Sequence, residues 1–211
     1  MSWLFDRISG ARRSAPSEAP LAHPPPREVH GSLALAALWQ ELPPGGRLEV
    51  LDLGPPLGAN VEFWGEAGAR LHVGDLYGSL FAERDGSENE SLAEILDLAE
   101  EERFDLVLAW DLFNYLSREE IASLADFLRR VCRPGALVFA LVAIGKTIPA
   151  EPYVFRFAGP ESLDYERRGD GEIAAPRWAP AEVAQAMPGF AVRRTFLLRH
   201  GVEEYLFARQ G

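Results

Sequence analysis

The chain has 211 residues, of which 47% are hydrophobic and 25% charged, so it can form one globular domain with a tail. With 32 acidic and 21 basic residues its formal net charge is −11, which disfavours nucleic acid as a partner unless a local basic patch exists. A single cysteine, Cys132, excludes an intrachain disulfide, and four scattered histidines argue against a metal site.

Residues 1–29 are predicted to form a disordered or proline-rich tail. The stretch from Ser14 to Arg27 is rich in proline and alanine, which support neither a helix nor a strand ladder. Residues 1–13 combine apolar side chains with arginines, compatible with a short helix that touches a membrane surface or a partner, or with a frayed end. No apolar run reaches the length of a membrane span and no secretory signal is recognisable, so we expect a cytoplasmic protein.

Residues 30–211 are predicted to form a single domain in which helices and strands alternate. Helices are expected at 31–41, 59–68, 92–102, 117–131 and 180–187, and strands at 48–53, 71–75, 104–110, 136–144, 190–198 and 202–209. The run 104–110 is almost continuously apolar, as is typical of a buried parallel strand. The last two strands are separated by three residues that include a glycine, which predicts a hairpin.

The helix at 117–131 has the clearest boundaries. Ser117 and Glu120 have the spacing of a capping box, and Pro134-Gly135 is expected to stop the helix. By contrast, residues 145–179 are rich in proline and glycine and are predicted to be an irregular insertion or a lid. Together the elements predict a three-layer α/β fold with a mostly parallel sheet and a C-terminal antiparallel hairpin.

Ligands of such sheets bind outside the carboxyl ends of the strands. Three predicted strand ends carry an aspartate there, namely Asp52, Asp75 and Asp111. Gly54 and Gly58 stand in the turn that leads from the first of these strands into a helix, where glycine permits a tight turn and a close ligand.

These residues resemble motifs of the class I S-adenosylmethionine-dependent methyltransferases over most of the chain, from about Leu33 to Arg209. The stretch Asp52-Leu53-Gly54-Pro55-Pro56-Leu57-Gly58 is similar to the first motif of the family, Asp-x-Gly-x-Gly-x-Gly. Asp75 matches the acid that binds the ribose of the cofactor. Segments 104–116, 131–140 and 178–192 resemble the fourth motif, the fifth strand and the C-terminal ending of the family.

The resemblance implies a Rossmann-like methyltransferase fold, S-adenosylmethionine as cofactor, and methyl transfer to a small-molecule or protein acceptor that the sequence does not identify. It implies no metal. The cofactor-binding residues it implies are Asp52, Gly54, Gly58, Asp75, Trp110 and Asp111. Asp111, Asn114 and Tyr115 lie at the strand mouth where an acceptor would arrive, and are the candidates for catalysis.

Structural roles are the alternative for each of these residues. The aspartates can cap turns, the glycines can serve only the loop, and Trp110 can be a core aromatic. Pro56 replaces the middle glycine of the motif, and no third strand is evident before Phe104. Both departures favour a second hypothesis, a methyltransferase-like protein that binds or scaffolds without catalysis. A nicotinamide-dependent oxidoreductase is a third, disfavoured because the loop lacks the Gly-x-Gly-x-x-Gly pattern.

Overall fold

The computed structural model describes residues 29–42, 45–81, 96, 98, 102–198 and 201–211. Its largest element is a six-stranded sheet in the order β10-β11-β5-β4-β2-β3. The strands are β2 (Glu49–Asp52), β3 (Arg70–Val73), β4 (Phe104–Trp110), β5 (Cys132–Ala143), β10 (Phe190–Leu197) and β11 (Val202–Arg209). Strands β3, β2, β4 and β5 pair in parallel, whereas β11 is antiparallel to both of its neighbours. The six predicted strands are therefore confirmed, in a sheet that is mixed.

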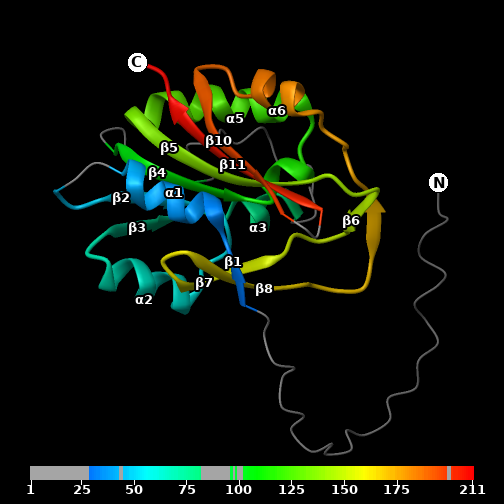
Figure 1. Cartoon of the computed structure of the whole chain (residues 1–211), viewed down its shortest axis with the longest axis horizontal. Coiled ribbons are helices and arrows are strands. Elements are labelled where there is room, and N and C mark those ends of the chain that lie inside the picture. Colours follow the sequence, from blue (N-terminus) through cyan, green and yellow to red (C-terminus); the bar gives the residue numbers. More distant parts are fainter. Residues whose placement is uncertain (1–28, 43–44, 82–95, 97, 99–101, 199–200) are drawn as a thin grey trace, which may run out of the picture.

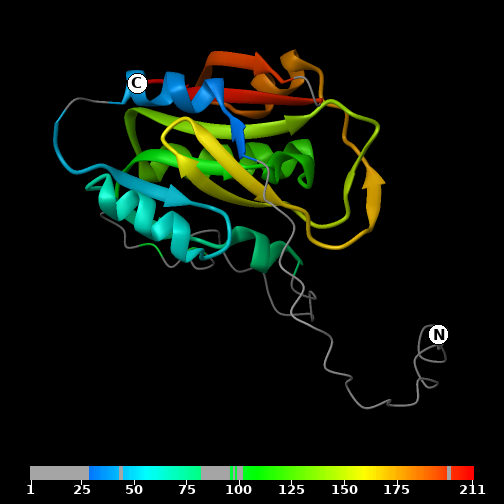
Figure 2. The same ribbon diagram turned by 60° about the horizontal axis from the view of Figure 1, so that its bottom comes forward.

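Helices lie on both sides of this sheet. They are α1 (Leu33–Glu41), α2 (Gly58–Glu66), α3 (Leu76–Phe81), the 3₁₀ helix η2 (Leu112–Asn114), α5 (Arg118–Val131) and α6 (Pro180–Ala186). In Figure 1, α5 and α6 run side by side above the sheet. Figure 2, turned to bring the lower side forward, shows α1 and α2 in front of the sheet and α5 behind it. The helices predicted to begin at residues 31, 59, 117 and 180 are thus present.

The capping box at the start of α5 is confirmed. Ser117 Oγ accepts a hydrogen bond from Glu120 N at 3.2 Å, and Glu120 Oε2 accepts one from Ser117 N at 2.8 Å. The helix ends at Val131, as predicted, but Pro134-Gly135 do not stop it, because both residues belong to β5. The helix ends where Cys132 becomes extended and pairs with Phe104 of β4.

Replacing Ser117 by alanine should lower the free energy of unfolding by about 1 kcal/mol, because an N-cap hydrogen bond is lost. Urea denaturation measures this change. The matched control is Ser123→Ala, within the same helix, where the hydroxyl donates only to Glu119 O at 2.9 Å. Since alanine has the higher helix propensity, the control should leave stability unchanged or slightly raise it. Equal losses for both variants would contradict a special role of the cap.

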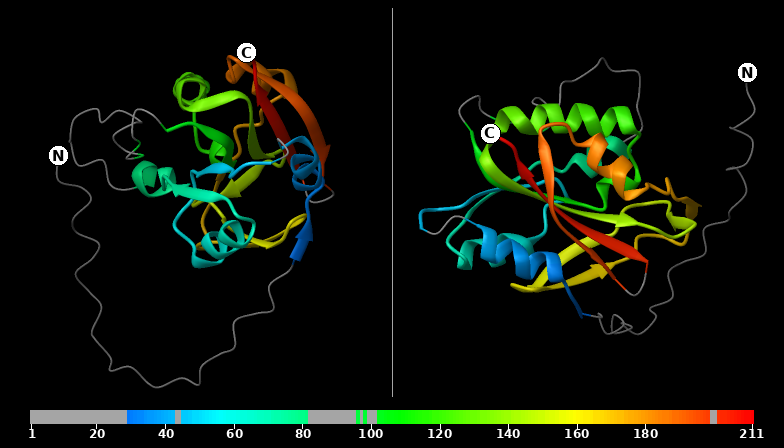
Figure 3. Two further views of the ribbon diagram at one scale, coloured as in Figure 1. Left: turned by 90° about the vertical axis from the view of Figure 1, so that its left-hand side faces the viewer. Right: turned by 45° about the horizontal axis from the view of Figure 1, so that its top comes forward.

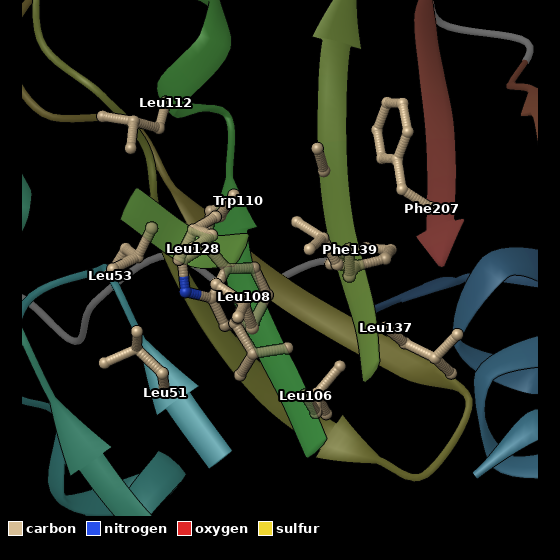
Figure 4. Packing of buried hydrophobic residues seen from close by; sticks show 14 of the residues in the cluster. Leu51, Leu53, Leu106, Leu108, Trp110, Leu112, Leu128, Leu137, Phe139 and Phe207 are labelled. Atoms are coloured by element: carbon tan, nitrogen blue, oxygen red, sulfur yellow. The ribbon is translucent and has the colours of Figure 1, made fainter. Parts of the chain in front are cut away.

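The core lies between the sheet and its helices. Leu51, Leu106, Leu108 and Phe139 are fully buried at 0% exposure, as expected for central strands covered on both faces. Figure 4 shows these side chains of β2, β4 and β5 next to one another, with Trp110 at the end of β4. This packing fixes the positions of the strand ends.

Residues 145–179, predicted to be an irregular insertion or a lid, contain four short strands. They form β6 (Thr147–Pro149), β7 (Val154–Gly159), β8 (Ser162–Glu166) and β9 (Glu172–Ala174). Strands β7 and β8 form an antiparallel hairpin, which β1 (Val29–Gly31) extends to three strands, and β6 pairs with β9. The right-hand view of Figure 3 shows this small sheet beside α1, on the side of the large sheet away from α5.

Two predictions fall outside the described residues. These are the tail, except for Val29 at the start of β1, and most of the helix expected at 92–102. In the described part of the chain, no helix combines the length and the apolar character that crossing a membrane requires.

Candidate functional site

The carboxyl ends of β2, β3 and β4 meet at one edge of the large sheet. Gly74 N, just after β3, donates to Asp52 O at 2.8 Å, and Leu53 N donates to Leu108 O of β4 at 3.0 Å. Asp52 and Trp110 are the last residues of β2 and β4, and Asp75 comes two residues after the end of β3. Because these strands pair in parallel, the three residues lie at the same edge of the sheet.

The Asp52 carboxylate is buried, at 1% exposure, and is bonded to the protein itself. Its Oδ1 accepts hydrogen bonds from Gly54 N at 2.9 Å and Trp110 Nε1 at 2.6 Å, and Asn60 Nδ2 lies 3.5 Å from its Oδ2. Burial raises the pKa of Asp52 to about 6, although these three donors oppose the rise. Asp52 thus joins β2, β4 and the turn that follows β2.

Gly54 is required by the close approach of Trp110. A Cβ at this position would lie 2.9 Å from Cδ1 of the indole and 3.1 Å from Oδ1 of Asp52. The structure therefore gives Gly54 and Trp110 a packing role, which was the structural alternative for both residues. Gly58 is exposed at the start of α2, and a Cβ there would meet nothing within 4 Å.

Gly54→Ala should lower the free energy of unfolding by about 1–3 kcal/mol, because the indole and the turn must shift to admit a methyl group. Thermal and urea denaturation measure the loss. Gly58→Ala is the matched control, four residues along the same turn, and should leave stability unchanged or slightly raise it. If Gly54→Ala were as stable as Gly58→Ala, the contact with Trp110 would not constrain the turn.

Strand β7 packs against α2, the helix that follows the glycine turn (residues 53–58), and against Trp110. Asn60 Nδ2 donates to Phe155 O at 3.1 Å, and Asn60 Oδ1 accepts from Phe157 N at 3.1 Å. The Phe155 ring stacks on Trp110 with centroids 5.3 Å apart and an interplanar angle of 2°. Phe157 stacks on Phe63 of α2 at 4.4 Å and 3°. The β7–β8 hairpin is therefore fixed to the helix that follows the turn.

Two residues at this edge have an unusual backbone conformation. Asp75 has φ 36° and Trp110 has φ 48°, and in the described part of the chain Arg177 is the only other non-glycine residue with positive φ. Such residues are strained by about 1–3 kcal/mol and concentrate at functional sites. The partly exposed carboxylate of Asp75 accepts a hydrogen bond from Gly78 N at 3.0 Å.

Asp111, directly after β4, is a second buried carboxylate, at 4% exposure. Its Oδ1 accepts a hydrogen bond from Tyr77 Oη at 2.5 Å and its Oδ2 accepts one from Tyr153 N at 3.1 Å. Burial raises the pKa of Asp111 to about 6, against the lowering effect of both donors. The pKa of Tyr77 is raised by its burial and by the charge of Asp111. Sequence analysis missed Tyr77, because its partner comes from a distant strand.

The other two catalytic candidates lie beside Asp111 and make structural contacts. Asn114 Nδ2 donates to Leu141 O at 3.1 Å and Asn114 Oδ1 accepts from Ala143 N at 2.9 Å, which joins η2 to the end of β5. Tyr115 Oη donates to Pro149 O at 3.1 Å. The predicted grouping of these residues at the strand mouth is therefore present, with η2 held in place by β5.

A cavity of about 210 Å³ opens next to this group. Asp111, Asn114 and Tyr115 line it, as does Glu204 of β11, a buried acid that sequence analysis did not single out. Besides Tyr115, its aromatic lining comprises His30, Tyr153, Phe155 and Tyr165.

Of Gly54, Gly58, Asp75 and Asp111, which the sequence predicts to converge on one pocket, only Asp111 lines this cavity. The reason is steric. Phe155 lines the cavity and stacks on Trp110, whose other contacts are Asp52 and Gly54, so these two rings separate the cavity from the glycine turn.

Among the described residues, no three histidine, cysteine, aspartate or glutamate side chains are grouped so that they could hold a metal ion. No protein-family model matches the chain, and no curated protein matches it.

Solved structures do resemble it. An S-adenosylmethionine-dependent methyltransferase from Mesorhizobium loti is 16% identical, with a TM-score of 0.52 over 83% of this chain and 96% of that one. The 1,6-didemethyltoxoflavin-N1-methyltransferase of Burkholderia thailandensis is 15% identical, with a TM-score of 0.46 over 84% of this chain and 77% of that one. The PH0226 protein of Pyrococcus horikoshii is 15% identical, with a TM-score of 0.49 over 83% and 88% of the two chains. The Mesorhizobium likeness shows that the chain has the fold of an S-adenosylmethionine-dependent methyltransferase.

Proposed function

We propose that residues 30–211 form one three-layer, Rossmann-like domain that transfers a methyl group from S-adenosylmethionine to a small acceptor. The observation that carries this proposal is the meeting of three acid-ended strands, β2, β3 and β4, beside a cavity at the carboxyl edge of a methyltransferase-type sheet. Ligands of parallel sheets bind at this edge. The strained backbone at Asp75 and Trp110 supports the same location.

The residues present fit the cofactor at the end of β3. Asp75 is partly exposed, and a carboxylate there can accept two hydrogen bonds from a ribose diol. No side chain caps the start of α2, and Gly58 leaves open space in front of it. Asp52 and Trp110 are bonded to each other, so in this proposal they shape the glycine turn and do not contact the ligand.

Strand β7 covers the start of the glycine turn, because Gly54 is buried against Trp110, Phe155 stacks on Trp110, and Asn60 binds the β7 backbone. Pro56 and Gly58, further along the turn, are exposed. We therefore propose that the arrangement with the β7–β8 hairpin on Asn60 is a closed form. The hairpin opens when the cofactor binds. The residues that connect it to β6 and β9 lie outside the large sheet, so the hairpin can move as a unit.

S-adenosylmethionine supplies an electrophilic methyl group on a positively charged sulfur when it is bound. The chain supplies orientation, exclusion of water and negative charge. The mostly apolar cavity excludes water around the acceptor. Asp111 lines the cavity and follows Trp110 directly, so its carboxylate stabilises positive charge between the cavity and the turn.

Titration calorimetry with S-adenosylmethionine tests this proposal. Asp75→Ala should weaken binding by about ten- to a hundredfold, because charge-assisted hydrogen bonds to the ribose are worth about 1.5–3 kcal/mol each. Asp75→Asn should be milder, since the amide keeps one acceptor. Pro56→Gly should leave binding unchanged or tighten it, because the turn regains an N–H donor.

Asp126→Asn is the control for loss of an acidic charge, since Asp126 is exposed on α5 and pairs with Arg129. It should bind the cofactor as the parent does. Binding that survives Asp75→Ala unchanged, in a variant shown by circular dichroism to be folded, would contradict the assignment of Asp75.

The second candidate function is a binding protein with a methyltransferase fold and no catalysis. This candidate is favoured by the hydrogen bonds that Gly54 N and Trp110 Nε1 donate to the Asp52 carboxylate. Both donors are used within the protein and are not directed at a ligand. An absence of heat with millimolar cofactor, for the parent and for a variant with a loosened hairpin, would favour this candidate.

A further inference from the structure

Phe155 contributes an aromatic ring to the cavity. One face of this ring is stacked on Trp110, with centroids 5.3 Å apart, and Trp110 is not among the described residues that line the cavity. Tyr153 and Tyr165, which do line it, lie 6.0 Å and 5.8 Å from the Phe155 ring and are tilted to its plane. The remaining surface of Phe155, with the tyrosines beside it, therefore offers aromatic contact to whatever enters the cavity.

Asp111 contributes a carboxylate that has hydrogen-bonding capacity left. Its Oδ1 accepts a hydrogen bond from Tyr77 Oη and its Oδ2 accepts one from Tyr153 N, so each oxygen has one donor from another residue. A carboxylate has about four acceptor sites. At least one further donor can therefore be accommodated on the side of Asp111 that faces the cavity.

Two hydroxyl groups of the lining also have capacity left. Ser32 is 4% exposed, and its Oγ accepts a hydrogen bond from Leu35 N at 3.1 Å. Within the described part of the chain, the Ser32 hydroxyl proton has no acceptor and Tyr153 Oη makes no hydrogen bond. Both hydroxyls can therefore donate to a ligand in the cavity.

The size and the remaining lining limit what fits. The volume is about 210 Å³, and Leu141, Ile148, Leu163 and Val202 are among the apolar residues around it. An apolar cavity of about 150 Å³ is sufficient to bind benzene. This cavity therefore accommodates one substituted ring.

These groups favour a neutral ligand that carries a hydroxyl. An anion would be repelled by the Asp111 carboxylate in a medium of low dielectric constant. A cation would lose its hydration in a mostly apolar space, although Asp111 already has two donors that stabilise its charge. A pure hydrocarbon would leave the Ser32 and Tyr153 hydroxyls without partners. A hydroxyl can donate to Asp111 and accept from one of these two groups.

We propose that the cavity binds a neutral phenol of one ring, with its hydroxyl donating to Asp111 and its ring against Phe155. Binding requires no cofactor. A hydrogen bond to a carboxylate is stronger than one between neutral groups, so Asp111 selects the hydroxyl. An aromatic pair gains more than its burial alone, so Phe155 selects an aromatic ring over a saturated one.

The part of this ligand in catalysis rests on the proposed function, in which the phenol is the methyl acceptor. A lone pair of its oxygen forms the new O–C bond while the S–C bond breaks and its electron pair stays on sulfur. The hydroxyl proton passes to Asp111, whose pKa of about 6 leaves it mostly ionised at pH 7, and then to water. The product is an aryl methyl ether.

Four small compounds test the proposal at pH 7 without cofactor: 4-methylphenol, its methyl ether 4-methylanisole, its saturated analogue 4-methylcyclohexanol, and the anion 4-methylbenzoate. Dissociation constants are measured by titration calorimetry or by ligand-observed NMR. The phenol should bind most tightly, the ether about tenfold more weakly, and the saturated alcohol about three- to tenfold more weakly. The anion should not bind. Binding of any other compound as tight as that of the phenol, or no binding of the phenol at about 10 mM, would overturn the proposal.

Two substitutions separate the two contacts. Asp111→Asn removes the charge and should reduce the preference for the phenol over its methyl ether to about threefold or less. Phe155→Leu keeps an apolar side chain but removes the ring, and should reduce the preference over the saturated alcohol to about twofold or less. Asp126→Asn, on α5 outside the cavity lining, controls for the loss of one negative charge and should keep both preferences.

Circular dichroism establishes which variants are folded, and either one is a sufficient test if the other does not fold. A folded Asp111→Asn or Phe155→Leu protein that keeps both preferences would overturn the assignment of the substituted residue. A merely structural role would weaken the three neutral compounds equally, and that result would also overturn it.

The outcomes also separate this proposal from the proposed function. If the phenol binds as described but S-adenosylmethionine produces no heat, the cavity assignment stands and methyl transfer fails. If the cofactor binds and the phenol does not, the cavity assignment is overturned and the proposed methyltransferase stands. The chemical readout is mass spectrometry of 4-methylphenol incubated with cofactor and protein, where conversion to 4-methylanisole is expected.

Discussion

Replacing Asn60 by alanine should tighten the binding of S-adenosylmethionine by about tenfold or more. The amide of Asn60 makes two hydrogen bonds to the β7 backbone, to Phe155 O and from Phe157 N, each at 3.1 Å. Both lie in a buried region, where hydrogen bonds contribute about 0.5–1.5 kcal/mol each. Their loss destabilises the closed hairpin and raises the fraction of protein in which the hairpin does not cover Gly54 and Trp110, and the apparent affinity rises with that fraction.

Phe157→Ala is a second variant with the same expected direction, because it removes the stacking on Phe63 and leaves Asn60 in place. Gln185→Ala is the control for loss of an amide, since Gln185 lies at the exposed surface, where its Oε1 accepts a hydrogen bond from Arg118. Titration calorimetry compares the four proteins after circular dichroism has established that each is folded. If both hairpin variants bind the cofactor as the parent does, or more weakly, the hairpin does not compete with the cofactor.

The second large effect is a fall in stability as the pH rises from about 4 to 7. Burial raises the pKa values of Asp52 and Asp111 from 3.8 to about 6 in the folded protein. At a pH between the pKa of the unfolded chain and that of the folded protein, the folded state binds more protons than the unfolded state. The stabilisation present below pH 4 is therefore lost as the pH rises through 6. For each carboxyl the change corresponds to about 3 kcal/mol.

Asp52→Asn isolates one of these contributions, because asparagine still accepts hydrogen bonds from Gly54 N and Trp110 Nε1 but does not ionise. Relative to the parent, this variant should gain about 2 kcal/mol in free energy of unfolding between pH 4.5 and pH 7. Urea denaturation at several pH values measures the difference, and Asp126→Asn should parallel the parent throughout. Parallel curves for Asp52→Asn and the parent would mean that Asp52 is not destabilised by its burial.

The sequence predicted those parts of the fold that local patterns determine. The apolar run of β4 and the capping box of Ser117 and Glu120 specify their elements through residues close in sequence, and both are present. The small sheet was missed because its strands are short, and because β1 pairs with β8 across more than a hundred residues of sequence. Such pairings leave no local periodicity that a sequence pattern can reveal.

The candidate site was predicted in part for the same reason. Parallel strands bring their carboxyl ends together, so the neighbourhood of Asp52, Asp75 and Trp110 follows from the order of the strands. The order of the strands does not predict which side chains bind each other, as the hydrogen bond between Tyr77 and Asp111 illustrates. Glu204 had one detectable signal: it lies two residues from Val202 and from Leu206, so it shares their face of β11 although it is charged.

Amide hydrogen exchange with and without S-adenosylmethionine tests most directly whether the cofactor binds at the glycine turn and displaces the hairpin. If the cofactor binds there and displaces the hairpin, amide exchange should be slower at residues 52–60 and 75–78 in its presence, and faster at residues 154–159 in β7. The opposite pattern, with residues 52–60 unchanged and 154–159 slower, would contradict it, as would a chain whose exchange the cofactor does not alter anywhere.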